Sequence, residues 1–361
     1  MEPARLVLSS APHLGMRSSS ARMAWLVAAG LAPAAAWGIF LFGVPAAIVL
    51  CVSVGAALLA ELLSSFFLKK LTITDGSAFL TGLLVGLFMS PSTPLYVPAA
   101  ASAFAILVVK QSFGGLGRNW MNPAMGGVLF ALLSWPGSTS RWTGAFAARN
   151  AAALPPLVAL RQALPSPTGG APLSVLAASG YRWSDLDARV IAWINTHVFA
   201  GLGTALQPGT FDMLIGRTPG PIGALSVPLL LVGAAFLLRR KIIRWRVPVF
   251  FLSAFFFLTL ALGGIASGGS WLSGGPGFHL FAGSIVLGAL FAASDPVTSP
   301  LSSRGQIIFG ISLGVLAFVM RFFGSLGDGV AVAIVLGNCV VPLIDSRFDG
   351  RATALSRGRR E

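Results

Sequence analysis

Three acidic residues lie within or beside apolar stretches, where a charge is costly and is a candidate for ion transport. Glu61 lies in "LLAELLSSFF", Asp75 in "TDGSAFLTG" and Asp295 in "ASDPVTSP". Glu61 is either an ion-binding group or a residue whose side chain reaches the nearby membrane surface. Asp75 either binds an ion or caps a helix, whereas the prolines near Asp295 favour a structural turn.

A second candidate is the glycine-rich stretch "FGGLGRNWMNPAMGG", residues 113–127. Its first three glycines permit a positive φ and close approach of the backbone. Asn119 and Asn122 supply hydrogen-bond donors and acceptors, and Pro123 suits the first turn of a helix. The stretch is either a binding loop or a tight turn between packed helices, and its density of special residues favours binding.

A third candidate is "LPSPTGGAPL", residues 164–173, an uncharged loop that offers the hydroxyl of Thr168. Its proline, glycine and serine content is also typical of a flexible linker. No phosphate-binding loop, dinucleotide fingerprint or Ser/His/Asp arrangement occurs, which disfavours a hydrolase or a motor ATPase. We therefore predict no catalytic residue in this chain itself.

The few cysteines and histidines are too scattered to predict a metal site or a disulfide framework. The two cysteines are Cys51 and Cys339, and the three histidines are His13, His197 and His279. Composition points to an integral membrane protein, since 55% of the 361 residues are hydrophobic and only 10% are charged. Mean hydropathy is +0.82.

Ten apolar spans are expected, so the predicted fold class is an all-α integral membrane protein. The spans are 24–42, 44–67, 77–90, 95–110, 121–135, 221–238, 247–265, 280–294, 306–322 and 329–344. The third and eighth are short and rich in Gly, Ser and Ala, which predicts broken or re-entrant elements. The stretch 182–199 reads as an amphipathic surface helix.

The net charge of +14 reports membrane orientation rather than nucleic-acid binding. With a cytoplasmic N-terminus, most basic residues fall in inside segments, including Lys110 and the cluster 239–246. Apart from Arg321, the others lie in the long segment 136–220, and long loops cross regardless of charge. We expect both termini inside, the first span retained as a helix rather than cleaved as a signal peptide, and 136–220 on the external or periplasmic side.

The two halves of the chain resemble each other. "LLVGLFMSPSTPL" matches "VLGALFAASDPVTSPL", and "FGGLG" matches "FGSLG" in the same order. Because each half has five spans, the second half enters from the opposite side, so we predict two inverted repeats rather than a chance likeness of glycine-rich helices. The expected division is a tail 1–23, a first repeat 24–135, the external segment 136–220, a second repeat 221–345 and a basic cytoplasmic tail 346–361.

These motifs add up to a family resemblance. "DGSAFLTGLLVGL", "KQSFGGLGRNWMNPAMGG", "DPVTSPLSSRGQIIFG" and "RFFGSLGDGVAVAIVLGNCVVPLID" closely resemble the RnfD family of the Rnf electron-transport complex. They are also similar to the NqrB component of the sodium-pumping NADH:quinone reductase. The resemblance implies a ten-helix inner-membrane flavoprotein that works with other membrane and redox subunits. It would transfer electrons through flavin and couple them to sodium or proton transport, as part of a ferredoxin:NAD oxidoreductase rather than as an enzyme alone.

The resemblance also implies two flavins. FMN would be joined through its phosphate to a threonine of an external loop, in a motif that resembles Ser-Gly-Ala-Thr-Pro-Leu. Riboflavin would be held near asparagines at the positions of Asn119 and Asn122. In this chain the acceptor position is Ala171, which has no hydroxyl, and Thr168 occupies the first position of the motif. FMN is thus bound without a covalent bond, attached at Thr168 through a shifted loop, or lost; we rank the shifted attachment last.

Two other functions stay open from the sequence. One is a channel or transporter of the urea or ammonium type, although His279 stands alone where ammonium channels are similar in using paired histidines. The other is a divergent Rnf-like scaffold subunit without covalent flavin. For the main hypothesis, we expect the flavin redox state to bias two arrangements of the repeats, with ions passing Glu61 and Asp75 near the midplane.

Overall fold

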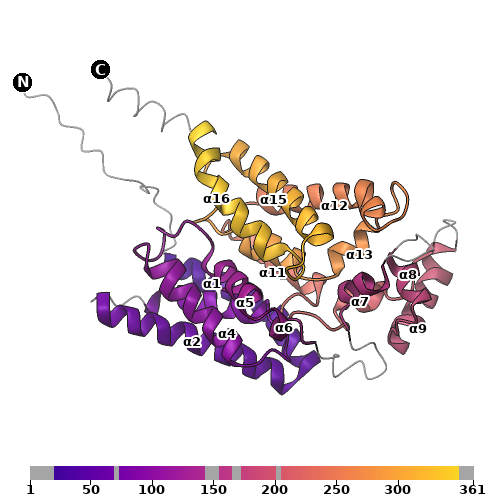
Figure 1. Ribbon diagram of the computed structural model, residues 1–361, viewed down its shortest axis with the longest axis horizontal. Helices are drawn as coiled ribbons and strands as arrows, with labels where there is room; N and C mark the ends of the chain where they lie inside the picture. Colours follow the sequence, from indigo (N-terminus) through magenta and orange to yellow (C-terminus); the bar gives the residue numbers. More distant parts are fainter. Residues whose placement is uncertain (1–19, 69–72, 143–153, 165–171, 201–204, 349–361) are drawn as a thin grey trace, which may run out of the picture.

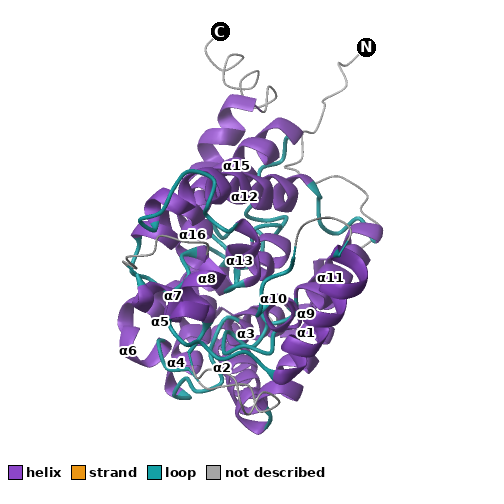
Figure 2. Ribbon diagram, turned by 90° about the vertical axis from the view of Figure 1, so that its right-hand side faces the viewer, coloured by secondary structure: helices purple, strands orange, loops and turns teal. Residues whose placement is uncertain are grey.

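The computed structural model describes residues 20–68, 73–142, 154–164, 172–200 and 205–348. Over these residues every regular element is a helix, as Figure 2 shows. Helices suit a bilayer because each one satisfies its own backbone N–H and C=O groups, which lipid cannot do. The all-helical prediction is therefore confirmed for the part of the chain that the structure describes.

The first half contains five apolar helical elements, which begin and end close to the predicted spans. They are α1 (Ser20–Phe42), α2 (Val44–Leu68), α3 (Ser77–Leu87), α4 (Tyr96–Phe104), which the π-helical η2 (Ala105–Gln111) continues, and α5 (Pro123–Ser134). A short 3₁₀ turn, η1 (Ile73–Asp75), precedes α3. Gly43, with a φ of 71°, lets the chain turn sharply from α1 into α2.

The second half also has a short, interrupted third element, but its fourth and fifth elements are longer than those of the first half. Its elements are α11 (Val227–Arg239), α12 (Arg246–Ala266), the pieces α13 (Pro276–Phe281), α14 (Ile285–Leu287) and η4 (Gly288–Ala292), then α15 (Ser303–Phe323) and α16 (Val330–Phe348). The chain leaves the helical path between α13 and α14, where Gly283 has a φ of 82°. The expected break in the stretch 280–294 is therefore observed.

Short helices fill the described parts of the segment between the halves. They are α6 (Pro136–Thr139), α7 (Pro156–Ala163), α8 (Pro172–Ala178), α9 (Asp185–Ile194), η3 (Asn195–Phe199) and α10 (Thr210–Ile215). The predicted surface helix at 182–199 is confirmed as α9 and η3. Figure 1 shows α7, α8 and α9 gathered at one end of the molecule, away from the C-terminal end of α16.

Five of the described helices are long and apolar enough to cross a membrane. They are Ala21–Phe42, Val44–Phe67, Arg246–Ala266, Ser303–Phe323 and Val330–Phe348. Four further apolar helices are shorter: Ser77–Leu87, Tyr96–Gln111, Pro123–Ser134 and Val227–Arg239. The chain is thus a multi-pass membrane protein that combines full-length helices with shorter ones.

The two halves lie side by side (Figure 1) and share one apolar core. α1 crosses α11 at Gly30 and Gly233, where a Cβ on Gly233 would overlap the carbonyl oxygen of Gly30. Only glycine permits this approach, so the crossing depends on the two residues. Lys110, the last residue of the expected span 95–110, is buried within η2.

Candidate functional site

Glu61 points into the protein although its helix borders the lipid. α2 exposes Leu59, Leu62 and Phe66 on its outer surface, whereas Glu61 is 0% exposed. The alternative in which Glu61 reaches the membrane surface is therefore wrong. A carboxylate at this depth requires charge compensation from the protein, because lipid and apolar side chains supply none.

Lys110 provides that compensation. Its Nζ donates to Glu61 Oε1 at 2.8 Å and to Ser77 Oγ at 2.6 Å. Ser77 Oγ donates in turn to Asp75 Oδ1 at 2.5 Å, and the Ser77 backbone N–H donates to the same oxygen at 2.8 Å. Glu61, Lys110, Ser77 and Asp75 thus form one connected group, the Lys110 network. The two acids singled out in the sequence are joined by a lysine and a serine that were not.

Local structure explains why these four residues meet. Lys110 belongs to the π-helical η2, and π-helical turns are rare and often mark functional positions. Asp75 ends η1, and Gly76 with a φ of 73° turns the chain so that Ser77 begins α3. Asp75 therefore holds the first residue of α3 and lies one hydroxyl from Lys110, whereas ion binding by Asp75 stays a prediction. The network thus brings two carboxylates and one ammonium together, and carboxylate oxygens are groups that can bind a cation.

Asp295 has the structural role expected of it. Its carboxylate accepts from the Val297 N–H at 3.1 Å and from Thr298 Oγ1 at 3.4 Å. Its backbone carbonyl accepts from the N–H groups of Thr298 and Ser299. These bonds close a turn between η4 and α15, as the flanking proline predicted.

The glycine-rich loop before α5 separates its two asparagines. Gly114, Gly115 and Gly117 all have a positive φ, of 99°, 92° and 89°, as the sequence predicted. Asn122 begins α5 by accepting from the N–H groups of the next turn, and its Nδ2 donates to the Ala292 carbonyl of η4 at 3.1 Å. Asn122 therefore fastens the first half to the second, and its side chain is occupied by protein contacts.

Asn119 differs from Asn122 because its side-chain oxygen accepts no hydrogen bond from the described residues. It is 6% exposed, and its Nδ2 donates to the Met121 carbonyl at 2.9 Å. No group among the described residues donates to its buried Oδ1. A buried amide oxygen without a donor is costly, so this oxygen is the stronger candidate of the two asparagines for a bound ligand.

A cavity of about 380 Å³ lies between the two halves, beside α7. Its walls combine the ends of α3 and α5 with the turns around 281–284 and 325–328. Most of the lining is apolar, but Arg161, Thr218 and Asp328 add polar groups. A largely apolar pocket with a few fixed polar groups is the usual form of a small-molecule site.

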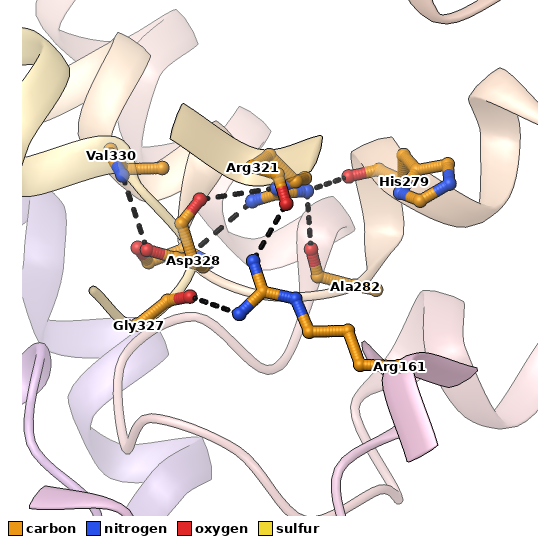
Figure 3. A network of polar contacts seen from close by, with 8 residues as sticks. Arg161, His279, Ala282, Arg321, Gly327, Asp328 and Val330 are labelled. Carbon is orange, nitrogen blue, oxygen red and sulfur yellow. Dashed lines mark hydrogen bonds and ion pairs between the residues drawn. The ribbon is translucent and has the colours of Figure 1, made fainter. Parts of the chain in front are cut away.

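One wall of the cavity is held by the buried guanidinium of Arg321 (Figure 3). Its Nη1 donates to the carbonyls of His279 and Ala282, and its Nε donates to the Asp328 carbonyl at 3.2 Å. Its Nη2 lies 3.6 Å from Asp328 Oδ2, and its plane lies over the Phe255 ring. Arg321 thus ties α15 to the break after α13 and to the loop before α16.

Arg161 links the segment between the two halves to the same wall. From α7 it donates to the Gly327 carbonyl at 3.0 Å and to the Arg321 carbonyl at 2.6 Å (Figure 3). Burial lowers the pKa of the Arg161 guanidinium, and the nearby Asp328 carboxylate opposes that shift. Asp328 also accepts from both the N–H and the hydroxyl of Ser284 at 2.5 Å, which closes the break before α14.

The loop that holds Thr168 and Ala171 lies outside the described residues. Of the described residues that flank it, Gln162 of α7 lines the cavity, whereas Pro172 begins α8 next to Gly275 at the start of α13. The helix before this loop therefore forms part of the cavity wall.

The predicted site residues fall into separate places. Glu61 and Asp75 are joined through Lys110 and Ser77, Asn119 and Asn122 belong to the loop before α5, and Thr168 lies outside the described residues. Sequence reasoning missed Lys110, Ser77, Arg161 and Asp328 as parts of these sites. One signal was available for the buried cations, because Lys110 and Arg321 each closely precede one of the matching FGGLG and FGSLG motifs.

Comparison with known proteins covers nearly the whole chain. Residues 7–353 match the model of the NQR2, RnfD, RnfE family. The D-type subunit of the proton-translocating ferredoxin:NAD(+) oxidoreductase complex of Clostridium ljungdahlii is 35% identical, over 94% of this chain and 93% of its own length. The D-type subunit of the ion-translocating oxidoreductase complex of Stutzerimonas stutzeri is 35% identical, over 91% of each chain. The counterpart from the Na(+)-translocating complex of Acetobacterium woodii is 30% identical, over 100% of this chain and 99% of its own length.

Proposed function

Because the chain belongs to the NQR2, RnfD, RnfE family, we propose that it is the RnfD-type subunit of an ion-translocating ferredoxin:NAD oxidoreductase complex. The observation that carries the proposal is the end-to-end similarity to D-type subunits whose names state this activity. These names favour a redox-driven translocase over a urea- or ammonium-type channel. The chain acts with other membrane and redox subunits, since one membrane subunit cannot complete the path from ferredoxin to NAD.

The proposed architecture has ten membrane elements in two inverted five-helix repeats, at 24–135 and 221–345. Three features support it. The third element of each half is short or broken, α1 and α11 meet glycine to glycine, and each half buries one cation at the end of its fourth element. Inverted repeats place related features on opposite membrane faces. The Lys110 network and the cavity would then face opposite sides.

The proposed orientation puts the tails 1–23 and 346–361 in the cytoplasm and 136–220 outside the inner membrane. The basic residues of the short loops support it. The position of α7, α8 and α9 also supports it, since they lie at the end away from the C-terminal end of α16 (Figure 1). The Lys110 network would then lie towards the cytoplasm and the cavity towards the exterior.

The proposed cofactor is a flavin held in the cavity beside α7. The volume of about 380 Å³ falls within the range of about 300–1,000 Å³ that is usual for small-molecule pockets. Arg161 and Thr218 offer donors for the polar edge of such a molecule, and apolar walls exclude water from it. When bound, a flavin supplies one- and two-electron redox chemistry. Ala171 does not fit covalent attachment, so we favour a flavin that is held without a bond to the chain over one attached at Thr168.

A second flavin site, for riboflavin, is proposed at the loop before α5. The buried Oδ1 of Asn119, which lacks a donor among the described residues, supports it. Asn122 acts there by fixing the loop to η4 rather than by direct contact. Ion transport is assigned to the Lys110 network, with Glu61 and Asp75 as the cation-binding carboxylates and either sodium or protons as the ion.

The activity can be tested in inverted membrane vesicles from the host with this gene deleted and then restored. Restored vesicles should reduce NAD with reduced ferredoxin and take up radioactive sodium or protons, and deleted vesicles should do neither. Equal activity in both would refute the proposed function. A restored strain with no ferredoxin-linked uptake of either ion would refute it as well.

The flavin assignment needs protein from the native host, where a flavin transferase would be present. Intact mass and ultraviolet-excited fluorescence on a denaturing gel separate the possibilities. We expect a dark band of unmodified mass, with flavin released when the native protein is denatured. A fluorescent band with one added FMN at Thr168 would show shifted attachment instead. A dark band with no released flavin would show a protein that has lost its flavin.

A further inference from the structure

We propose that Lys110 is an internal counter-cation that moves between Glu61 and Asp75 and so admits the transported cation to Glu61. This inference rests on the proposed ion transport and deepens it, because it assigns a role in that transport to a residue that the sequence analysis used only for membrane orientation. Lys110 acts as a positioning residue for the cation site rather than as a ligand of the transported ion.

The first observation is that Lys110 and Glu61 are both buried and carry opposite charges. Lys110 is 1% exposed and Glu61 is 0% exposed, and their charged atoms lie 2.8 Å apart. A buried carboxylate that loses its paired cation is strongly destabilised unless other groups compensate its charge. A transported cation therefore cannot simply add to Glu61, where the ammonium already occupies Oε1. It can replace the ammonium if the ammonium has another place to go.

The second observation supplies that place. Lys110 Nζ also donates to Ser77 Oγ, and the same hydroxyl donates to Asp75 Oδ1. A single hydroxyl group therefore separates the ammonium from a second carboxylate. Rotation of the Ser77 hydroxyl and of the flexible lysine stem would bring Nζ to Asp75 without moving a helix. Throughout the exchange, each carboxylate keeps a cation or a hydroxyl donor.

The third observation is that the two carboxylates differ in their surroundings. Glu61 lies inside the bundle on a membrane-spanning helix, whereas Asp75 is half-buried at the 3₁₀ turn before α3. Lysine at Asp75 would leave the deep carboxylate to the transported cation, and lysine at Glu61 would expel that cation. One side chain therefore alternates the deep site between a bound and a closed state, which is what coupling requires.

A static ion pair is the alternative, and the two differ in what Ser77 does. The Ser77→Ala substitution keeps the Glu61–Lys110 pair and the backbone bond from residue 77 to Asp75, and it removes only the bridging hydroxyl. A static pair predicts no effect. A moving lysine predicts slower coupled turnover, because the variant lacks the hydroxyl that links the ammonium to Asp75. Ser64→Ala is the matched control, since this buried hydroxyl donates only to the Glu61 backbone carbonyl.

The experiment uses the whole complex in proteoliposomes, with ferredoxin-driven NAD reduction and the uptake of radioactive sodium and of protons measured together. For Lys110→Gln we expect electron transfer to continue while the number of cations taken up per electron falls at least about fivefold, the lower end of typical coupling energies. Ser77→Ala should lower coupled turnover at an unchanged amount of complex. Ser64→Ala should match the wild type.

The outcomes separate the inference from the function on which it rests. No cation uptake by the wild-type complex would remove the proposed function itself. Normal wild-type uptake together with an unchanged ratio in Lys110→Gln would overturn the inference. If Lys110→Gln does not assemble, Ser77→Ala decides alone, and a rate equal to that of Ser64→Ala would overturn the inference too. Uptake of sodium or of protons by the wild type identifies which cation replaces the lysine.

Discussion

Lys110 and Arg321 are buried cations at related places in the two halves, and they are neutralised in different ways. Lys110 lies just before the FGGLG motif and Arg321 just before FGSLG. Lys110 Nζ meets the Glu61 carboxylate directly at 2.8 Å. Arg321 lies 3.6 Å from Asp328 Oδ2 and makes its shorter bonds to backbone carbonyls. Lys110 is therefore neutralised mainly by an opposite charge, whereas Arg321 is held mainly by hydrogen bonds to backbone carbonyls in fixed positions.

The chemistry of the two side chains agrees with this division. An ammonium is a compact charge on a flexible stem, so it can exchange partners. A guanidinium is a rigid planar fork that suits several carbonyls in fixed positions. Arg321 reaches three carbonyls from two segments, and its Cζ lies 5.1 Å from the centre of the Phe255 ring. We conclude that Arg321 in the second half fixes the cavity wall. Lys110 in the first half is a cation on a flexible stem that can exchange its hydrogen-bond partners.

The largest effect is expected from Glu61→Ala. Removing the carboxylate leaves the Lys110 ammonium buried without its ion-pair partner, which should cost about 3–5 kcal/mol of stability. Cation uptake should be lost together with the carboxylate. Thermal unfolding of the purified protein and uptake by inverted vesicles would measure the two effects. An unchanged melting temperature would show that the pair does not carry the charge balance that its geometry indicates.

A double variant separates charge balance from transport. Glu61→Leu with Lys110→Met replaces the pair by apolar groups of similar size, which is often neutral for stability. We expect the melting temperature to return close to that of the wild type while cation uptake stays absent. If uptake also returned, the Lys110 network would not be the ion site.

The sequence predicted much of the fold because membrane helices follow directly from hydropathy and charge. The expected spans coincide with helical elements, and the glycines before α5 adopt the positive φ that their spacing suggested. The FGxLG motif shared by the two halves did not predict the same backbone conformation in both. Gly114 has a φ of 99°, whereas its counterpart Gly324 has a φ of −88°. Packing of the following residues decides that difference, and one sequence does not contain it.

The sites were predicted only in part, because partners far apart in the chain cannot be paired from one sequence. Glu61 was found because an acid in an apolar run is conspicuous. Lys110 was counted only as a basic residue that sets membrane orientation, because its contacts with Glu61 and Ser77 are made from a π-helical turn that the sequence did not predict. Arg161 and Asp328 come together only when α7 packs against the loop before α16.

Arg321→Lys should have the next largest effect. Lysine keeps the charge but cannot reach the carbonyls of His279, Ala282 and Asp328 at once, so at least one would lose its donor. Each buried group left without a partner costs about 1–3 kcal/mol. We expect a lower melting temperature and less flavin retained on purification. Lys110→Arg is the matched exchange in the other half. Equal loss of flavin from Arg321→Lys and Lys110→Arg would contradict the conclusion that only Arg321 fixes the cavity wall.

A smaller effect is expected from glycines of the two loops that follow these cations. Gly117→Ala places a Cβ in open space at a φ of 89°, so only backbone strain of about 1 kcal/mol should result. Gly329→Ala has a φ of 81° and also brings its Cβ to 2.6 Å from Met320 Cβ, beside Arg321. Melting temperatures should therefore fall further for Gly329→Ala. The reverse order would show that the loop before α5 is the more tightly packed of the two.

The smallest effect concerns Asp212, a buried carboxylate whose hydrogen bonds come from Ser184 rather than from a lysine. Burial raises its pKa, and Asp187 adds to the rise, while the Ser184 bonds and Arg217 oppose it. A raised folded-state pKa means that its contribution is complete below the usual aspartate value, about 3.9, and is lost as pH rises through the folded value. Melting temperature should therefore depend less on acidic pH in Asp212→Asn than in the wild type. Identical pH profiles would show that hydrogen bonds alone compensate a buried carboxylate here, and would weaken the reason for requiring Lys110 beside Glu61.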